Sequence, residues 1–162
     1  MVFEDERTGT WHAYGKATSS NAQTRLDRNP SGDSRELASF KPISLAGSSR
    51  FVGYLAIHFP EVVVGIEAED LGVLHLEVAA LKTATRDAIL RRDWTTARRH
   101  FAFVDSVLEI AEIELHDAIG ISYLVNLFYN ETSINFAKAR TLLPKRLAVA
   151  LEIMERHYEE LT

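Results

Sequence analysis

The chain has 162 residues, of which 46% are hydrophobic and 25% are charged, a composition typical of one globular domain. It contains no cysteine, which excludes disulfide bonds, cysteine-based zinc sites and thiol nucleophiles. No apolar run approaches the roughly eighteen residues of a membrane helix, and the N-terminus MVFEDER is acidic where a secretory signal is basic, so we expect a cytoplasmic protein without membrane contact.

The first 49 residues show neither a helical nor a strand periodicity. Between Gly15 and Glu36 the aliphatic side chains are few: Ala17, Ala22 and Leu26. Such a segment buries too little apolar surface to offset its ordering entropy, so residues 1–49 are predicted to form a flexible or loosely docked N-terminal segment. Trp11 and Tyr14 are the exception, and they fit either a short partner-binding motif or a patch that docks on the core.

The folded domain is expected to begin with a short helix that ends before Pro60. Ser48 or Ser49 can cap its N-terminus, and Pro60 disfavours a helical conformation at the residue before it. Residues 62–66, which contain three valines and a glycine, are predicted to be a linker that includes a helical turn. A second helix is predicted over residues 70–92, because its apolar positions recur at helical spacing.

The third predicted helix is the centre of the fold. Asp93 can cap it, and its apolar positions follow one another at steps of three and four: Trp94, Ala97, Phe101, Val104, Leu108, Ala111, Leu115 and Ala118. Because the preceding connection is very short, the second and third helices are expected to form an antiparallel hairpin. Glutamates at a helix C-terminus oppose its dipole, so a break is predicted near Glu112 to Glu114, followed by a fourth helix that ends at Phe128.

Two further helices are predicted in the C-terminal part. Residues 130–133 form a loop that ends in a suitable cap, and a short fifth helix is expected over residues 134–142. Pro144 suits the first turn of a sixth helix, where its missing N–H is harmless. The predicted fold class is therefore all-α: a single compact bundle of about five to six helices over residues 50–162, with a largely disordered N-terminal tail.

Five acidic residues lie close together near the end of the third helix, with no lysine or arginine among them: Asp105, Glu109, Glu112, Glu114 and Asp117. Residues 50–162 carry twelve basic and seventeen acidic side chains, which disfavours binding to nucleic acid. Asp105, Glu109 and Glu112 are spaced by four and three residues, so they share one helix face. The cluster is either a solvated face, a docking surface for a basic protein partner, or a metal site.

The metal hypothesis uses Glu109, Glu112 and His116 as ligands. Di-iron bundles place glutamate and histidine at positions i and i+3 on two helices, and the sequence lacks this spacing. His75, His100 or His116 with a nearby glutamate are the remaining candidates for a single metal ion. There is no HExxH, GxSxG or glycine-rich phosphate loop, so no catalytic residue and no cofactor is predicted, and the question of enzyme activity stays open.

Two other groups of side chains allow more than one interpretation. Four arginines bracket the connection between the second and third helices: Arg91, Arg92, Arg98 and Arg99. They can receive a phosphate or an acidic peptide, or they can pair with Asp93 and with acids on neighbouring helices, and the second interpretation is favoured. Phe103 and Tyr129 lie off the main apolar stripe, so they are candidates for a second packing face or a self-association surface, and the oligomeric state stays open.

Three short motifs follow one another in the predicted helical domain: Phe59-Pro60-Glu61, Leu115-x-x-Ala118-Ile119 with Ser122-Tyr123-Leu124 after it, and Leu142-Leu143-Pro144. In this order they resemble a bacterial family of small all-α domains of unknown function. The resemblance covers about residues 51–161 and brings no catalytic residues with it. Some similar small acidic bacterial proteins are immunity partners of secreted toxins, so the resemblance implies a function of this type.

The preferred hypothesis is a small cytoplasmic binding protein of the immunity type. It would engage a basic protein partner through its acidic helical face: Asp105, Glu109, Glu112, Glu114 and Asp117. The alternative is a metal- or small-molecule-binding helical enzyme that uses histidine and glutamate side chains in a cleft. If Asp105, Glu109 and Glu112 are buried or neutralised within the fold, the first hypothesis loses its binding surface.

Overall fold

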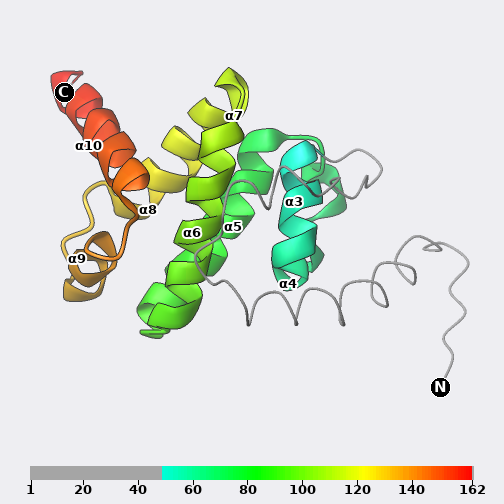
Figure 1. Cartoon of the computed structure of the whole chain (residues 1–162), viewed down its shortest axis with the longest axis horizontal. Coiled ribbons are helices and arrows are strands. Elements are labelled where there is room, and N and C mark those ends of the chain that lie inside the picture. The colour runs from blue at the N-terminus through cyan, green and yellow to red at the C-terminus, as the bar shows by residue number, and fades with distance from the viewer. Residues whose placement is uncertain (1–48, 162) are drawn as a thin grey trace, which may run out of the picture. The chain divides into compact units, whose positions relative to one another are not determined.

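The computed structural model describes residues 49–161, and in this part of the chain every regular element is a helix (Figure 1). The elements are α3 (Arg50–His58), α4 (Pro60–Val64), the 3-10 helix η1 (Ala68–Asp70), α5 (Leu74–Leu90), α6 (Trp94–Ile110), α7 (Ile113–Ala118), the π-helix η2 (Ile119–Val125), α8 (Asn126–Phe128), α9 (Ile134–Arg140) and α10 (Lys145–Glu160). The predicted all-α bundle is confirmed. Apart from Ser49, the predicted N-terminal segment with Trp11 and Tyr14 lies outside the described residues.

The junction of α3 and α4 follows from Pro60. The Ser49 hydroxyl accepts the N–H of Val52 at 3.4 Å and caps α3, as predicted. Because proline restricts the residue before it, Phe59 adopts φ −141° and ψ 63°, and α3 ends there. The helical turn expected within residues 62–66 is α4, which begins at Pro60, where the missing N–H leaves no hydrogen bond unmade.

Helices α5 and α6 form the predicted hairpin and pack against each other (Figure 1). The helix predicted over residues 70–92 is shorter than expected, because Gly72 adopts φ 90° before α5 and Arg92 adopts φ 59° after it. Asp93 caps α6 as predicted, since its Oδ1 accepts the Thr96 N–H at 3.1 Å. Among residues 49–161, no helix combines the length and the apolar composition that crossing a membrane requires.

Two faces of α6 are packed into the core. The predicted stripe supplies the first of them, with the buried residues Ala97, Phe101, Val104 and Leu108. Phe103 belongs to the second: it is 4% exposed, and its ring lies 6.1 Å from that of Phe51 and 5.4 Å from that of Phe59. Tyr129 is half-buried, with its ring 5.5 Å from that of Tyr158. Both aromatic residues therefore take part in packing within the chain.

A break separates α6 from α7 where the sequence predicts it. Ala111 and Glu112 are extended, with ψ of 135° and 165°. The predicted fourth helix is a run of α7, η2 and α8 that reaches Phe128. In η2 the backbone is a π-helix, a rare form that is enriched at functional sites. Gly120 lies there, and an added Cβ would come within 3.3 Å of Met154 Sδ, so α10 packs closely against η2.

The two predicted C-terminal helices are present as α9 and α10. The predicted helix over residues 134–142 ends earlier, at Arg140, and Pro144 precedes α10 instead of lying in its first turn. Arg140 pairs with Glu155 of α10 and also donates to the Phe128 carbonyl at 2.8 Å. These bonds hold α9 and α10 to the end of α8, and α10 packs on η2 and α6.

Candidate binding groove and acidic corner

The five predicted acidic residues surround the junction of α6 and α7, and we call them the acidic corner. Asp105 and Glu109 lie in the last two turns of α6. Glu112 precedes α7, and Glu114 and Asp117 lie on that helix. Asp105 is half-buried, whereas the other four are exposed. The fold thus brings these carboxylates to one end of the hairpin, although α6 and α7 are separate helices.

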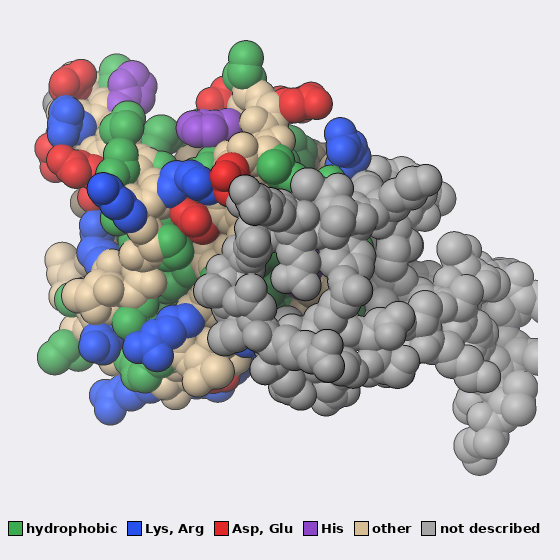
Figure 2. Space-filling model, viewed as in Figure 1, with side chains coloured by type: hydrophobic (Ala, Val, Ile, Leu, Met, Phe, Trp, Pro, Cys, Tyr) green, Lys and Arg blue, Asp and Glu red, His purple; other side chains and the backbone are tan. Residues whose placement is uncertain are grey.

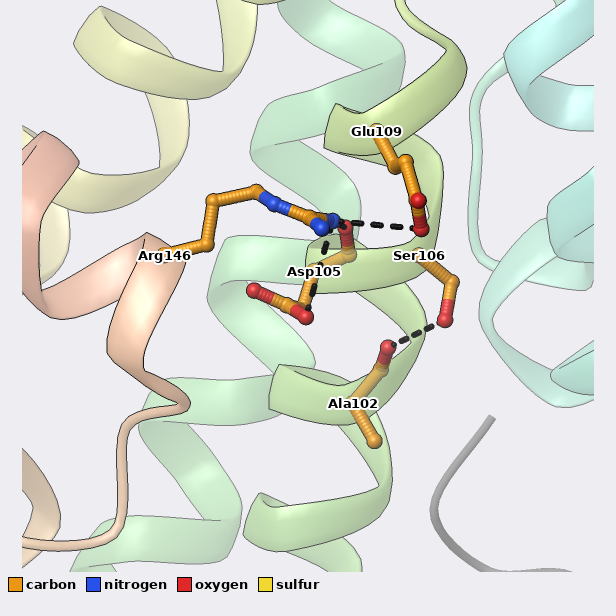
Figure 3. A network of polar contacts seen from close by, with 5 residues as sticks. All are labelled: Ala102, Asp105, Ser106, Glu109 and Arg146. Atoms are coloured by element: carbon orange, nitrogen blue, oxygen red, sulfur yellow. Dashed lines mark hydrogen bonds and ion pairs between the residues drawn. The ribbon is translucent and has the colours of Figure 1, made fainter. Parts of the chain in front are cut away.

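Arg146 of α10 reaches two carboxylates of the acidic corner (Figure 3). Its Nη1 lies 3.4 Å from Glu109 Oε2 and 3.8 Å from Asp105 Oδ2, and it donates to the Asp105 carbonyl oxygen at 2.9 Å. The Arg146 side chain is 43% exposed, so solvent screens both ion pairs. Two of the five predicted carboxylates are therefore paired within the fold, which reduces the charge that this part of the corner presents.

The carboxylate of Asp105 differs from the others in its burial. Its Oδ1 is buried and has no hydrogen-bond partner in the described part of the chain. Burial raises the pKa of Asp105, whereas Arg146 and the Leu147 N–H act in the opposite direction. Asp105 therefore holds its negative charge less readily than a fully solvated aspartate does.

The carboxylates of Glu112, Glu114 and Asp117 are free. None of them has an ion-pair or hydrogen-bond partner among residues 49–161. Ile113 lies between the first two and is 84% exposed. This part of the acidic corner thus places three unpaired carboxylates beside one exposed apolar side chain.

A groove of about 410 Å³ lies beside the acidic corner, and we call it the binding groove. Its lining comes from α6, α7, η2 and α10: Leu108, Glu109, His116, Asp117, Ile119, Gly120, Leu124, Arg146, Val149, Ala150, Ile153 and Met154. Figure 2 shows the surface hollowed between the upper ends of α10 and α7, with hydrophobic, acidic and histidine side chains around the hollow. Most of the lining is apolar, and its acidic members belong to the acidic corner.

Helix α10 contributes one face to the core and another to this groove. Leu147 and Leu151 lie on the core face and are buried. A second set lies at positions i, i+3, i+4 and i+7 and shares another face of α10: Arg146, Val149, Ala150 and Ile153. Val149 is 46% exposed and Ile153 is 57% exposed. A bundle helix needs only one apolar stripe for its own packing. Apolar residues at helical spacing on a second face, such as Val149 and Ile153, are therefore the sequence signal for this groove.

The three histidines considered as metal ligands lie in different surroundings. His116 lines the binding groove. His75 is exposed, with its Nδ1 2.7 Å from Ser122 Oγ. His100 is buried, with its Nδ1 3.0 Å from Thr85 Oγ1, and its pKa is lowered to about 4, first by burial and then by Arg99. They therefore do not line one cleft.

No metal site is assembled in the part of the chain that the structure describes. Among residues 49–161, no three histidine, aspartate or glutamate side chains come together as ligands of one ion would. The weak candidates Glu109, Glu112 and His116 thus form no such group, although Glu109 and His116 both line the binding groove. The groove accordingly offers apolar contact and charge rather than a set of metal ligands.

The four arginines near the connection between α5 and α6 lie in different surroundings. The Arg99 guanidinium lies 5.4 Å from the centre of the Phe59 ring, and its Nε is buried without a hydrogen-bond partner. Arg91, Arg92 and Arg98 are exposed. Within residues 49–161 none of the four arginines forms an ion pair, and Asp93 caps α6 instead.

Comparison with known proteins identifies a family. A family model described as "Domain of unknown function (DUF7674)" matches residues 52–159. The match confirms the resemblance to a family of unknown function, and its bounds agree with the range of about 51–161 indicated by the three motifs. No curated protein and no solved structure matches the chain.

Proposed function

The chain belongs to this family of unknown function, and we propose that it is a small protein-binding domain that engages a basic protein partner through its acidic corner. One observation carries this proposal. Glu112, Glu114 and Asp117 are exposed and have no partner among residues 49–161, and they adjoin the exposed side chain of Ile113. Clustered charge of one sign speeds and orients association with a partner of the opposite sign.

The proposed surface is centred on α7. Asp105 and Glu109 were also predicted to bind the partner, but both lie within ion-pair distance of Arg146. Exposed ion pairs contribute only about 0 to 1 kcal/mol, so a partner's lysine or arginine can still compete for Glu109. Glu112, Glu114 and Asp117 have no internal ion pair to break among residues 49–161, so in this proposal they supply the larger share of the attraction.

The proposal extends to a function of the immunity type in the cytoplasm of a bacterium. Small acidic proteins that neutralise secreted toxins are the precedent that the sequence resemblance supplies. A chain without cysteine forms no disulfide bonds, so the proposed cytoplasmic location is compatible with its composition. The neighbouring genes provide a test: a gene for a secreted toxin beside this one supports the immunity type, whereas a surrounding metabolic operon counts against it.

A charge-reversal experiment tests the binding surface. The full chain is immobilised as wild type and as the triple variant Glu112→Lys/Glu114→Lys/Asp117→Lys, and proteins from the source cells are captured at low and at moderate salt. A basic protein captured by the wild type should be lost with the variant, and its retention should fall as salt rises.

The matched control changes the same number of charges elsewhere. Glu61, Glu67 and Glu69 are exposed and lie outside the acidic corner and the binding groove. Their replacement by lysine changes the net charge by the same amount and should leave capture intact. If both triple variants lose the captured protein equally, net charge alone is responsible and the acidic corner is not the binding surface.

A further inference from the structure

The binding groove has two helical walls. One wall is the second face of α10, where Val149 and Ile153 are about half exposed. The other is α7 with the start of η2, which contributes His116, Asp117 and Ile119. Between these walls α6 adds Leu108. The exposed apolar side chains of the groove therefore belong to the α10 wall, because Ile119 on the other wall is 1% exposed, and the exposed residues of that other wall are His116 and Asp117.

Exposed apolar surface continues beyond the lining of the groove. Ile113 precedes His116 and Asp117 by three and four residues, so the three side chains share one face of α7. Ile113 is 84% exposed, and Ile153 on the other wall is 57% exposed. This surface is longer than the groove itself, and an extended partner covers it better than a compact small molecule does.

We propose that the binding groove holds an amphipathic α-helix of a basic partner protein. The apolar stripe of that helix packs against Val149 and Ile153 of α10, and its lysine or arginine side chains lie on the side of α7. Helices that dock in grooves present apolar anchors at i, i+3, i+4 and i+7, and such anchors can pack on Val149 and Ile153, which lie one turn apart on α10. The inference rests on the proposed function and names the element that the partner uses.

Charge decides the orientation of the bound helix. Asp117 lines the α7 wall, Glu114 lies on the same helix and Glu112 directly precedes it, and the three carboxylates have no partner in the described part of the chain. Arg146 lines the groove on the α10 side. Basic side chains of the partner therefore fit on the α7 side, and the residue that faces Arg146 should be neutral or acidic.

Charge also argues against a second copy of the chain as the occupant. A symmetric dimer through this groove would use the same patch of both copies. Each copy would bring the five carboxylates of the acidic corner and the single arginine Arg146 to such an interface, so the two patches would repel each other overall. A basic helix has the complementary charge instead.

A displayed library of 16-residue helical peptides provides the probe. The peptides are selected on the full chain, and the best binder is synthesised and titrated by fluorescence anisotropy. Enriched peptides should share apolar residues at helical spacing, with lysine or arginine along one edge. Val149→Asp and Ile153→Asp should each weaken binding about tenfold or more, since they place a charge against the apolar stripe.

Two exposed apolar residues outside the groove serve as controls. Val73 is 47% exposed and Ile134 is 80% exposed, and neither lines the groove. Val73→Asp and Ile134→Asp should leave the affinity within about twofold of the wild type, because changes on a surface that the peptide does not touch are nearly neutral. Equal weakening by control and groove variants would overturn the groove as the binding site.

Three other outcomes are informative. If the triple lysine variant of the acidic corner loses the peptide while Val149→Asp and Ile153→Asp keep it, the acidic surface stands and the groove is overturned. If the library does not enrich basic amphipathic sequences, the proposal that the partner binds through a helix is overturned. A concentrated wild-type chain that sediments as a dimer, and as a monomer with Ile153→Asp, would assign the groove to a second copy and overturn the proposal.

Discussion

Thr85 of α5 and His100 of α6 are joined by a hydrogen bond in the core, with 3.0 Å between Thr85 Oγ1 and His100 Nδ1. The Thr85 hydroxyl donates its single proton to the Leu81 carbonyl at 2.8 Å. The hydroxyl oxygen of Tyr123, in η2, lies 2.9 Å from Thr85 Oγ1. His100 Nδ1–H and the Tyr123 hydroxyl must therefore both donate to Thr85, so one oxygen atom links three helices and fixes the tautomer of His100.

Replacing Thr85 by valine should be strongly destabilising. The change leaves two buried donors without an acceptor, so the free energy of unfolding should fall by about 2 to 4 kcal/mol. Thr83 is the matched control on the same helix, because it is exposed and its hydroxyl donates to the Ala79 carbonyl at 3.0 Å. Thr83→Val should cost less than about 0.5 kcal/mol. Urea unfolding of both variants measures the difference, and equal losses would contradict the role of the network.

Stability should fall in mild acid because of two histidines, His100, which is buried, and His58, which is half-buried. Burial, followed by the charge of Arg99, lowers the pKa of His58 and His100 to about 4. The ordinary histidine pKa of about 6.5 applies in the unfolded chain, which therefore binds more protons between pH 6.5 and 4. The free energy of unfolding should thus decrease as the pH falls through this window, by about 2 kcal/mol per histidine from pH 7 to pH 5.

Urea unfolding at pH 7, 6 and 5 measures this slope. His58 has a buried Nε2 without a hydrogen-bond partner, and its ring lies 5.3 Å from that of Phe103, so leucine is a suitable replacement. His58→Leu should remove about half of the decrease between pH 7 and pH 5, since one of the two histidines no longer titrates. An unchanged slope in this variant would show that His58 does not contribute to the pH dependence of the free energy of unfolding.

Local signals in the sequence predict most of the helix boundaries. Ser49 and Asp93 cap the helices that they were expected to cap, and Pro60 separates α3 from α4. The break before Glu112 also follows from local charge. These features depend on neighbours within about four residues along the chain, which is the range that capping and the helix dipole cover.

The candidate site could not be predicted in the same way, because it depends on contacts that are distant in the sequence. Arg146 and Asp105 are 41 positions apart, and no local pattern indicates that they meet. The groove needs α10 to lie against η2, where Gly120 permits the close approach of Met154. The acidic residues themselves are visible in the sequence, but which of them remain unpaired is decided by tertiary packing.

Glu77 should be important for the start of the folded domain. Its side chain is fully buried, and its Oε1 accepts the Gly72 N–H at 2.8 Å and the Ser49 N–H at 3.1 Å. One carboxylate thus ties the start of α3 to the loop before α5. Glu77→Ala should lower the free energy of unfolding by about 3 kcal/mol, since it removes two charge-assisted hydrogen bonds.

The matched variant for this test is Glu77→Gln, which keeps the accepting oxygen and removes the charge. It should lose clearly less stability than Glu77→Ala in urea unfolding, because both N–H groups keep an acceptor. Hydrogen exchange of the Gly72 amide should accelerate most in Glu77→Ala. If the two variants are equally stable, the hydrogen bonds of Glu77 contribute little.

The ion pair in Figure 3 can be tested through the titration of Asp105. Arg146 lowers the pKa of Asp105 against the larger effect of burial, so Arg146→Gln should raise that pKa further. Carbon-13 NMR of the Asp105 carboxyl group measures it. Arg156→Gln is the control, because Arg156 also lies on α10 but pairs with Glu152 at 3.0 Å.

The same variant connects the ion pair to the proposed function. Without Arg146, Asp105 and Glu109 lose the cation that they share, so the acidic corner becomes more negative. A basic helical peptide should then associate faster with Arg146→Gln than with the wild type at low salt, and the difference should shrink as salt rises. A slower association would mean that Arg146 contacts the partner itself, and an Asp105 pKa that does not change would mean that the ion pair is not maintained in solution.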